Sequence, residues 1–272
     1  MRFALAETGG RRVPVAEQDG RLTPLVATPG QGLIDLIAAG EPLRPSGAPP
    51  FGEARLLAPL RPGKIVAVGL NYSDHVREAG MQAPERPLLF TKFTTSVIGP
   101  GEAIRIDSQL TERVDWEVEL AVVIGARARH VAEQDALAHV FGYTIANDVS
   151  ARDLQFSDGQ WVRAKSLDTF CPLGPVVVEA AEIPDPQALS LRTRVNGEVV
   201  QDSSTAEMVF GVAELISFCS HSFTLDPGDM LLTGTPWGCG EFMQPPRSLQ
   251  PGDVVEVSID GIGSLSNPVE CA

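Results

Sequence analysis

Cysteine and histidine are scarce in this chain, whose 272 residues include four of each. The cysteines are widely spaced and form no Cys-x-x-Cys pair, which argues against a zinc knuckle or a small disulfide-bonded scaffold. No two histidines stand at a spacing typical of metal ligands either. A metal site in this protein would therefore use oxygen ligands, which suit magnesium, manganese or calcium better than zinc.

Three common active-site motifs are also missing. The chain has no Gly-x-Gly-x-x-Gly after a strand, no Walker lysine loop and no Gly-x-Ser-x-Gly elbow. These motifs bind nucleotide cofactors and phosphates, or present a nucleophilic serine. Their absence argues against nucleotide-dependent enzymes and serine hydrolases.

Positive charge and long apolar runs are in short supply as well. Lysine and arginine number 21 against 35 acidic residues, which gives a net charge of −14. We therefore expect no binding to nucleic acid and no attraction to anionic membranes. Residues 1–7 hold only a short apolar stretch, so we expect neither a signal peptide nor a membrane span, and a cytoplasmic location.

Proline divides the chain near residue 60. Residues 41–63 contain six prolines, a density that disfavours helix and central strand. We predict a small N-terminal α/β domain with a proline-rich linker over residues 1–62, and a catalytic domain over residues 63–272. The second part has many short strands, a hairpin signal at Asn196-Gly197, and a capping box from Ser204 to Glu207 that predicts a helix start. The fold class expected is α+β, mainly β.

Three carboxylates form the first candidate site. Glu117 and Glu119 precede the apolar run of residues 120–124, and alternate residues of a strand share one face roughly 6.5 to 7 Å apart. Asp148 follows a second apolar run. A solvated acidic strand face is the alternative, but buried converging carboxylates repel each other unless a cation is present. The pattern favours a metal site.

His75 and Glu78 form the second candidate. A helix beginning near Ser73 would place them on one face, where the carboxylate can orient the imidazole for proton transfer. The alternative is an ordinary pair on a helix surface.

Polar residues after Asp148 form the third candidate. Arg152, Gln155 and Lys165 could surround a carboxylate next to a polarisable carbonyl, although surface pairing with nearby aspartates is the alternative. Residues 233–240 form a glycine-rich loop that either approaches a ligand or packs a tryptophan in a turn.

Five ordered segments together resemble the fumarylacetoacetate hydrolase (FAH) family, from about Lys64 to the C-terminus. The segments are Gly69–Glu78, Asp115–Glu119, Asn147–Gln155, Lys165–Thr169 and Thr233–Pro236. The resemblance implies a mixed β-sandwich roll, usually assembled as a homodimer.

The resemblance also implies roles for the candidate residues. Glu117, Glu119 and Asp148 would hold Mg²⁺ or Mn²⁺, with Ca²⁺ as a further option, and His75 with Glu78 would form a catalytic dyad on a mobile lid.

Four further residues would contact the carboxylate and oxo group of a small keto acid: Arg152, Gln155, Lys165 and Thr235. Lys165 would also stabilise the charge of an enolate. Trp237 stands where the family often has proline, so we expect its indole to contact the distal part of the substrate.

The reaction expected first is hydrolysis of a carbon–carbon bond in a 2,4-dioxo acid, either an acylpyruvate or a diketo-deoxy sugar acid. The same site would serve a decarboxylase of oxaloacetate or a related β-keto acid, or an isomerase of hydroxy-dienoates. A non-catalytic protein that binds a metal or senses a ligand is the alternative from a different class.

Overall fold

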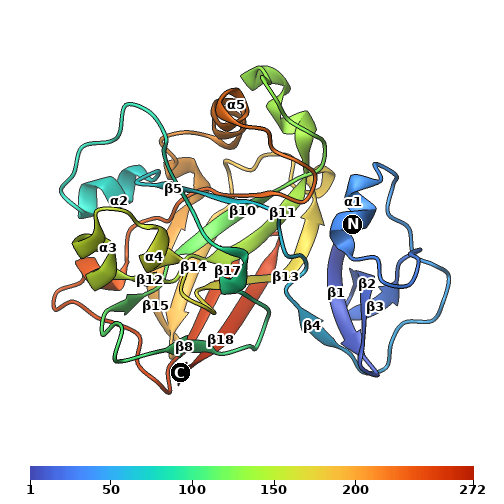
Figure 1. Ribbon diagram of the computed structural model, residues 1–272, viewed down its shortest axis with the longest axis horizontal. Helices are drawn as coiled ribbons and strands as arrows, with labels where there is room; N and C mark the ends of the chain where they lie inside the picture. The colour runs from blue at the N-terminus through green and yellow to red at the C-terminus, as the bar shows by residue number, and fades with distance from the viewer.

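A mixed sheet of eleven strands forms the body of the computed structural model, which describes residues 1–272 (Figure 1). Its strands in spatial order are β3 (Arg21–Pro24), β2 (Arg11–Gln18), β1 (Arg2–Thr8), β13 (Cys171–Glu179), β11 (Val140–Asn147), β10 (Val118–Ile124), β16 (Met230–Leu232), β5 (Ile65–Gly69) and β6 (Leu88–Thr91). Two short strands join off this path: β4 (Arg55–Leu57) pairs with β1, and β7 (Val97–Ile98) pairs with β13. Parallel pairing occurs only between β16 and β5 and between β13 and β7, so the sheet is mixed.

A second sheet packs against the centre of the first. Its order is β15 (Glu198–Ser204), β14 (Ser190–Val195), β17 (Val254–Ile259), β18 (Gly263–Cys271) and β8 (Ile104–Ile106). Strands β14, β17 and β18 contact β10, β11 and β13, and one apolar core runs between the two sheets. The predicted hairpin at Asn196-Gly197 joins β14 to β15, and both turn residues have positive φ. A separate pair, β9 (Val114–Asp115) and β12 (Ser150–Ala151), lies beside the candidate carboxylates.

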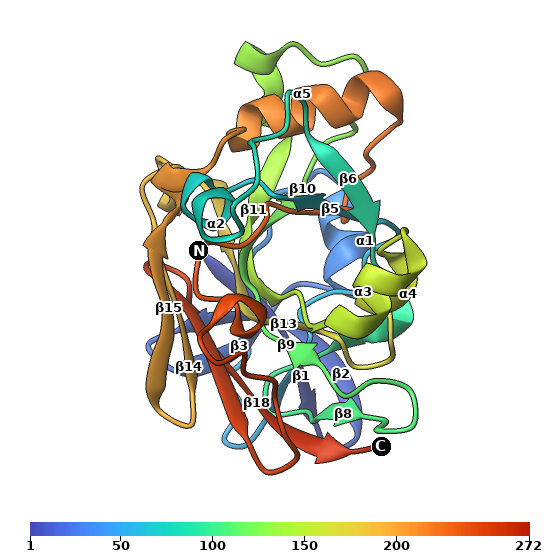
Figure 2. The ribbon, with the colours of Figure 1, turned by 90° about the vertical axis from the view of Figure 1, so that its left-hand side faces the viewer.

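Helices are short and lie outside the sheets. They are α1 (Leu33–Ala38), α2 (Ser73–Glu78), α3 (Arg152–Asp158), α4 (Val162–Lys165) and α5 (Val212–Ser222). In Figure 2, α2, α3 and α4 surround one end of the central strands, while α5 crosses the far end. The expected α+β, mainly β architecture is confirmed. None of the helices has both the length and the apolar character required to cross a membrane.

The helix predicted from the capping box at Ser204 begins later than expected. Ser204 accepts a hydrogen bond from the N–H of Ala206, but only one 3-10 turn follows, and α5 begins at Val212. The carboxylate of Glu207 accepts hydrogen bonds from Ser73 and Arg77. It therefore does not close the box, and the turn is not extended.

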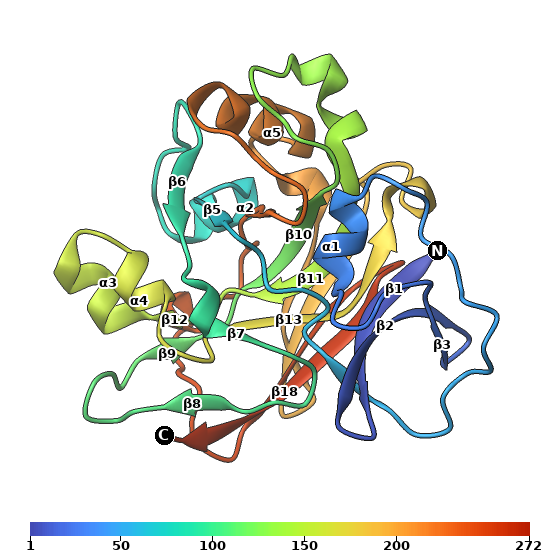
Figure 3. The same cartoon turned by 45° about the vertical axis from the view of Figure 1, so that its right-hand side comes forward.

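The N-terminal segment shares the main sheet and part of its core. Strand β1 pairs with β2 on one side and with β13 on the other, and Phe3, Leu33 and Ile37 pack with Val177 of β13. Figures 1 and 3 show β1, β2, β3 and α1 on one side of the molecule and α3 with α4 on the opposite side. The predicted boundary near residue 62 thus separates two parts that share one sheet.

Candidate functional site

Strand register brings the three carboxylates together. In the antiparallel pair of β10 and β11, Val118 lies opposite Asn147, and the N–H of Asp148 donates to the carbonyl of Glu117 at 2.9 Å. Glu117, Glu119 and Asp148 each place a carboxylate oxygen within 4.8 Å of the others. All three side chains are buried, so the alternative of a solvated acidic face does not apply.

Cations contact two of the three carboxylates. Lys165 Nζ lies 2.8 Å from both Glu117 and Asp148, and Lys92 Nζ lies 2.6 Å from Asp148. Arg152 contacts the other oxygen of Glu117 at 2.8 Å. Glu119 has no cationic partner and accepts one backbone hydrogen bond at 2.8 Å, from Gly234. Negative charge is therefore least compensated at Glu119.

This imbalance separates the pKa values of the two glutamates. Burial raises the pKa of Glu119 well above its usual range, and repulsion from Asp148 and Glu117 raises it further. Burial would also raise the pKa of Glu117, but attraction to Lys165 and Arg152 outweighs burial and lowers it. A divalent cation would supply the charge that Glu119 lacks, and the all-oxygen donor set suits such an ion. The residues present therefore fit a divalent metal.

The His75 and Glu78 pair lies beside this centre, on α2. His75 Nδ1 is 3.3 Å from Glu78 Oε2, and the imidazole packs edge-on against Phe242. The N–H of Gly238 donates to both carboxylate oxygens of Glu78, at 3.0 and 3.1 Å. His75 is buried and Glu78 is largely covered, so this is not a solvated surface pair.

A cavity of about 260 Å³ connects these groups. Its polar lining comprises His75, Glu117, Arg152, Gln155, Lys165 and Thr235. Its apolar lining includes Val68, Phe90, Phe156, Trp161 and Phe242. The cavity is therefore polar near the carboxylates and apolar on its remaining wall.

Arg152 is held on two sides and keeps one donor free. Its Nε donates to Asp115 at 2.8 Å, and its Nη1 donates to Gln155 at 2.9 Å. Nη2 is buried and has no hydrogen-bond partner. An unpaired buried guanidinium N–H is costly, so Nη2 is a candidate donor for an anionic ligand bound next to Arg152, which lines the cavity. The alternative of surface cations fails for Arg152 and Lys165, which are 4% and 2% exposed.

Trp237 is not brought to the cavity. Its side chain points outward, 45% exposed, and its indole N–H donates to the carbonyl of Asp202 at 3.2 Å. The tryptophan that lines the cavity is Trp161, which also packs edge-on against Phe90. Gly69 makes room for this indole, because a Cβ there would lie 2.3 Å from the Trp161 ring.

Sequence reasoning missed two charged residues. Lys92 is fully buried and donates to Asp148, and Asp115 holds Arg152 and accepts from the N–H groups of Gly240 and Glu241. Asp115 lay inside the acidic segment and could have been considered as a partner for Arg152. Lys92 follows an apolar strand and offered no local signal, because its partner lies 56 residues away.

Fold and site together define a mainly β protein with a buried acidic centre that could hold a divalent metal, beside a His–Glu pair. Residues 64–270 match the profile of the fumarylacetoacetate (FAA) hydrolase C-terminal family, and the chain belongs to this family.

Two relatives of this chain are named oxaloacetate tautomerases. Oxaloacetate tautomerase fahd2, mitochondrial, from Xenopus laevis is 50% identical over 217 residues, which cover 79% of this chain and 68% of the relative. Oxaloacetate tautomerase FAHD2A, mitochondrial, from Homo sapiens is 47% identical over 223 residues, covering 81% and 71%.

Solved structures resemble the whole chain. A fumarylacetoacetate hydrolase from Exiguobacterium antarcticum has 41% identity and a TM-score of 0.93, with full coverage of both chains. A 5-carboxymethyl-2-hydroxymuconate delta-isomerase from Mycobacterium smegmatis has 38% identity and a TM-score of 0.86, again with full coverage. The chain is thus an enzyme-family member whose relatives include tautomerases, isomerases and hydrolases.

Proposed function

We propose that this protein interconverts the keto and enol forms of a 2-oxo dicarboxylic acid, with oxaloacetate as the leading substrate. The observation that carries the proposal is the 50% identity to an oxaloacetate tautomerase over 79% of the chain. An isomerase is also the enzyme type in the name of the Mycobacterium smegmatis structure. These relatives favour the alternative expected from the sequence, an enzyme of oxaloacetate or an isomerase of hydroxy-dienoates, over hydrolysis of a 2,4-dioxo acid.

Substrate binding is assigned to the polar wall of the cavity. The free Nη2 of Arg152 would donate to a substrate carboxylate, and Gln155 and Thr235 lie in the same lining. The cavity of about 260 Å³ suits a small acid. Trp161, which lines the cavity, would contact the distal part of the bound substrate, the role first expected of Trp237.

Proton transfer is assigned to His75. With Nδ1 hydrogen-bonded to Glu78, Nε2 is the nitrogen left for substrate. In the proposed step Nε2 takes a proton from C3, and the electron pair of that C–H bond forms the C2–C3 double bond. The oxo oxygen takes one proton from solvent as the enol hydroxyl, and His75 returns the abstracted proton to solvent. The reverse step restores the keto form, and no co-substrate is consumed. Lys165, buried beside the acidic centre, would stabilise negative charge on the substrate oxygen.

Glu117, Glu119 and Asp148 would hold a divalent metal, which we propose to be Mg²⁺ or Mn²⁺. When bound, such an ion supplies electrophilic polarisation of an oxo oxygen, which makes the adjacent C–H more acidic.

Hydrolysis of a 2,4-dioxo acid is the second candidate, favoured by the 41% identity to the Exiguobacterium hydrolase. In that reaction His75 would take a proton from water rather than from carbon. Decarboxylation of oxaloacetate would need no such proton removal. The three reactions therefore differ in what His75 does.

A product panel tests the proposal. Protein with Mg²⁺ or Mn²⁺ is offered oxaloacetate and acetylpyruvate, and the species formed are identified by NMR. Faster equilibration of keto and enol oxaloacetate without pyruvate supports the tautomerase. Pyruvate plus acetate from acetylpyruvate indicates the hydrolase, and pyruvate plus carbon dioxide from oxaloacetate indicates the decarboxylase. His75→Gln should lose the tautomerisation, whereas its matched control His221→Gln should keep it, because His221 lies at the exposed end of α5.

Two further expectations stay predictions. We propose a homodimer, which sedimentation equilibrium would test, and a cytoplasmic location, which fractionation of the source cells would test.

A further inference from the structure

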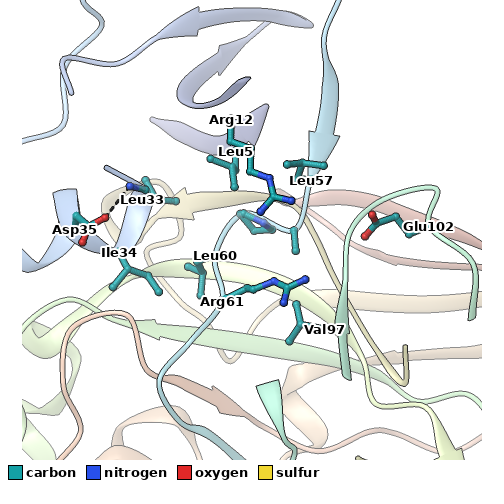
Figure 4. Close-up of a pocket in the computed structure, with 13 residues that line it drawn as sticks. Leu5, Arg12, Leu33, Ile34, Asp35, Leu57, Leu60, Arg61, Val97 and Glu102 are labelled. Carbon is teal, nitrogen blue, oxygen red and sulfur yellow. Dashed lines mark hydrogen bonds between the residues drawn. The ribbon is translucent and has the colours of Figure 1, made fainter. Parts of the chain in front are cut away.

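A second cavity lies between the N-terminal segment and the main sheet, away from the acidic centre. It measures about 390 Å³ and is walled by β1, β2, β4, the first turn of α1, residues 57–61 and the start of β7 (Figure 4). None of the residues lining it lines the cavity beside His75 and Glu117, which we call the catalytic cavity. This cavity, which we term the seam cavity, is therefore a separate space.

Two arginines enter the seam cavity without partners. Figure 4 shows Arg12 extending past Leu5 and Leu57, and Arg61 extending past Leu60 toward Val97. Neither guanidinium forms an ion pair or donates a hydrogen bond within the protein. Both residues are exposed, so their guanidinium groups remain free to donate to a ligand in the hollow.

The two acids in the lining are already engaged. Asp35 accepts a hydrogen bond from the N–H of Gly32 at 2.7 Å. Glu102 accepts from the N–H of Gly99 at 2.6 Å and lies 3.6 Å from Arg55. Each acid therefore has a partner other than Arg12 and Arg61, and an added anion would supply acceptors for these two arginines.

The remaining lining is apolar, so the uncharged part of a ligand bound there should be apolar as well. Leu5, Leu33, Leu57, Leu60 and Val97 form this wall. We propose that the seam cavity binds a small organic anion, one with a compact apolar body and a carboxylate or phosphate group held by Arg12 and Arg61. The apolar body would remove leucine surface from water while the two guanidinium groups hold the charged end.

Direct binding to the full-length protein tests this proposal. Isothermal titration calorimetry would use hexanoate and phenyl phosphate as probes, with hexanamide as the uncharged match and inorganic phosphate as the match without an apolar body. Hexanoate and phenyl phosphate together distinguish a carboxylate from a phosphate preference. We expect one or both to bind, and we expect hexanamide and inorganic phosphate to bind at least about tenfold more weakly.

Variants then locate the binding. Arg12→Gln and Arg61→Gln should each lower the affinity for the probe about tenfold, because each variant removes a charged donor. Arg11→Gln, on the adjacent residue of β2, should leave affinity unchanged, since Arg11 does not line the cavity. Arg152→Gln should also leave it unchanged, which separates the seam cavity from the catalytic one. Oxaloacetate turnover should be unaffected by Arg12→Gln and Arg61→Gln.

Several results would overturn the proposal. Equal binding of hexanamide would remove the role of charge, and loss of binding in Arg152→Gln alone would assign the probe to the catalytic cavity. Equal loss in Arg11→Gln would indicate nonspecific attraction. Dissociation of an oligomer in Arg12→Gln or Arg61→Gln would show that a second copy of the chain occupies the cavity.

Discussion

Replacing Glu119 by glutamine should weaken metal binding and stabilise the metal-free protein at alkaline pH. Glutamine has nearly the same shape and retains an oxygen for the N–H of Gly234, but it removes one of three charges within 4.8 Å. Two unit charges at that distance interact by ~3.5 kcal/mol at an effective dielectric constant of ~20. Lys165 offsets part of this repulsion, so we expect a net gain of about 1 kcal/mol in the free energy of unfolding. Magnesium affinity should fall roughly 100-fold, about 2.7 kcal/mol.

The sign of the pH effect follows from the raised pKa of Glu119. A carboxyl whose pKa is higher in the folded than in the unfolded protein favours folding while it is protonated. That contribution is complete below the usual value of 4.5 and is lost as pH rises through the raised pKa of the folded state. Metal-free protein should therefore lose stability with rising pH relative to the glutamine variant. Urea unfolding between pH 5 and 9, with and without Mg²⁺, measures both effects.

Two outcomes of this experiment would refute the reasoning. If Mg²⁺ raised the unfolding midpoint of Glu119→Gln as much as that of the unchanged protein, Glu119 would not be a ligand. If the metal-free variant were less stable at pH 9, repulsion among the three carboxylates would not be the dominant effect. Glu112→Gln is a suitable control, because this exposed carboxyl lies outside the triad.

Four further predictions address the same site. Magnesium affinity should rise with pH, by up to about tenfold per unit while Glu119 titrates, and calorimetry in Glu119→Gln should show a flatter dependence. His75→Gln should lower kcat for tautomerisation at least ~100-fold with Mg²⁺ affinity unchanged, and normal turnover would contradict the proton-transfer role. Arg152→Lys should raise KM about tenfold, because lysine cannot supply the guanidinium fork; an unchanged KM would remove Arg152 from substrate binding. Gly69→Ala should lower kcat/KM about tenfold by displacing Trp161, and partial recovery in the double variant with Trp161→Ala would link the two residues.

The acidic centre was predictable because its geometry is local. Alternation along a strand puts Glu117 and Glu119 on one face, and the apolar run after them indicates burial. Asp148 required one further step, the adjacency of β10 and β11, which consecutive strands often have. The β-roll itself came from the family resemblance, because strand pairing such as β1 with β13 joins residues about 175 positions apart.

Contacts between distant segments and loop orientations were the parts that sequence could not supply. Lys92 meets Asp148 across 56 residues, and no periodicity connects them. Trp237 and Trp161 both stand near predicted site segments, and only the backbone path decides which indole faces the cavity. The turn after Ser204 likewise depended on tertiary partners of Glu207.

Deuterium exchange at C3 of oxaloacetate, followed by proton NMR in D₂O, tests the central claim most directly. Enolisation by His75 predicts loss of the C3 signal faster than in buffer, dependent on added Mg²⁺ or Mn²⁺, without accumulation of pyruvate and absent in His75→Gln. Exchange no faster than in buffer, or exchange that occurs only together with pyruvate formation, would contradict a tautomerase.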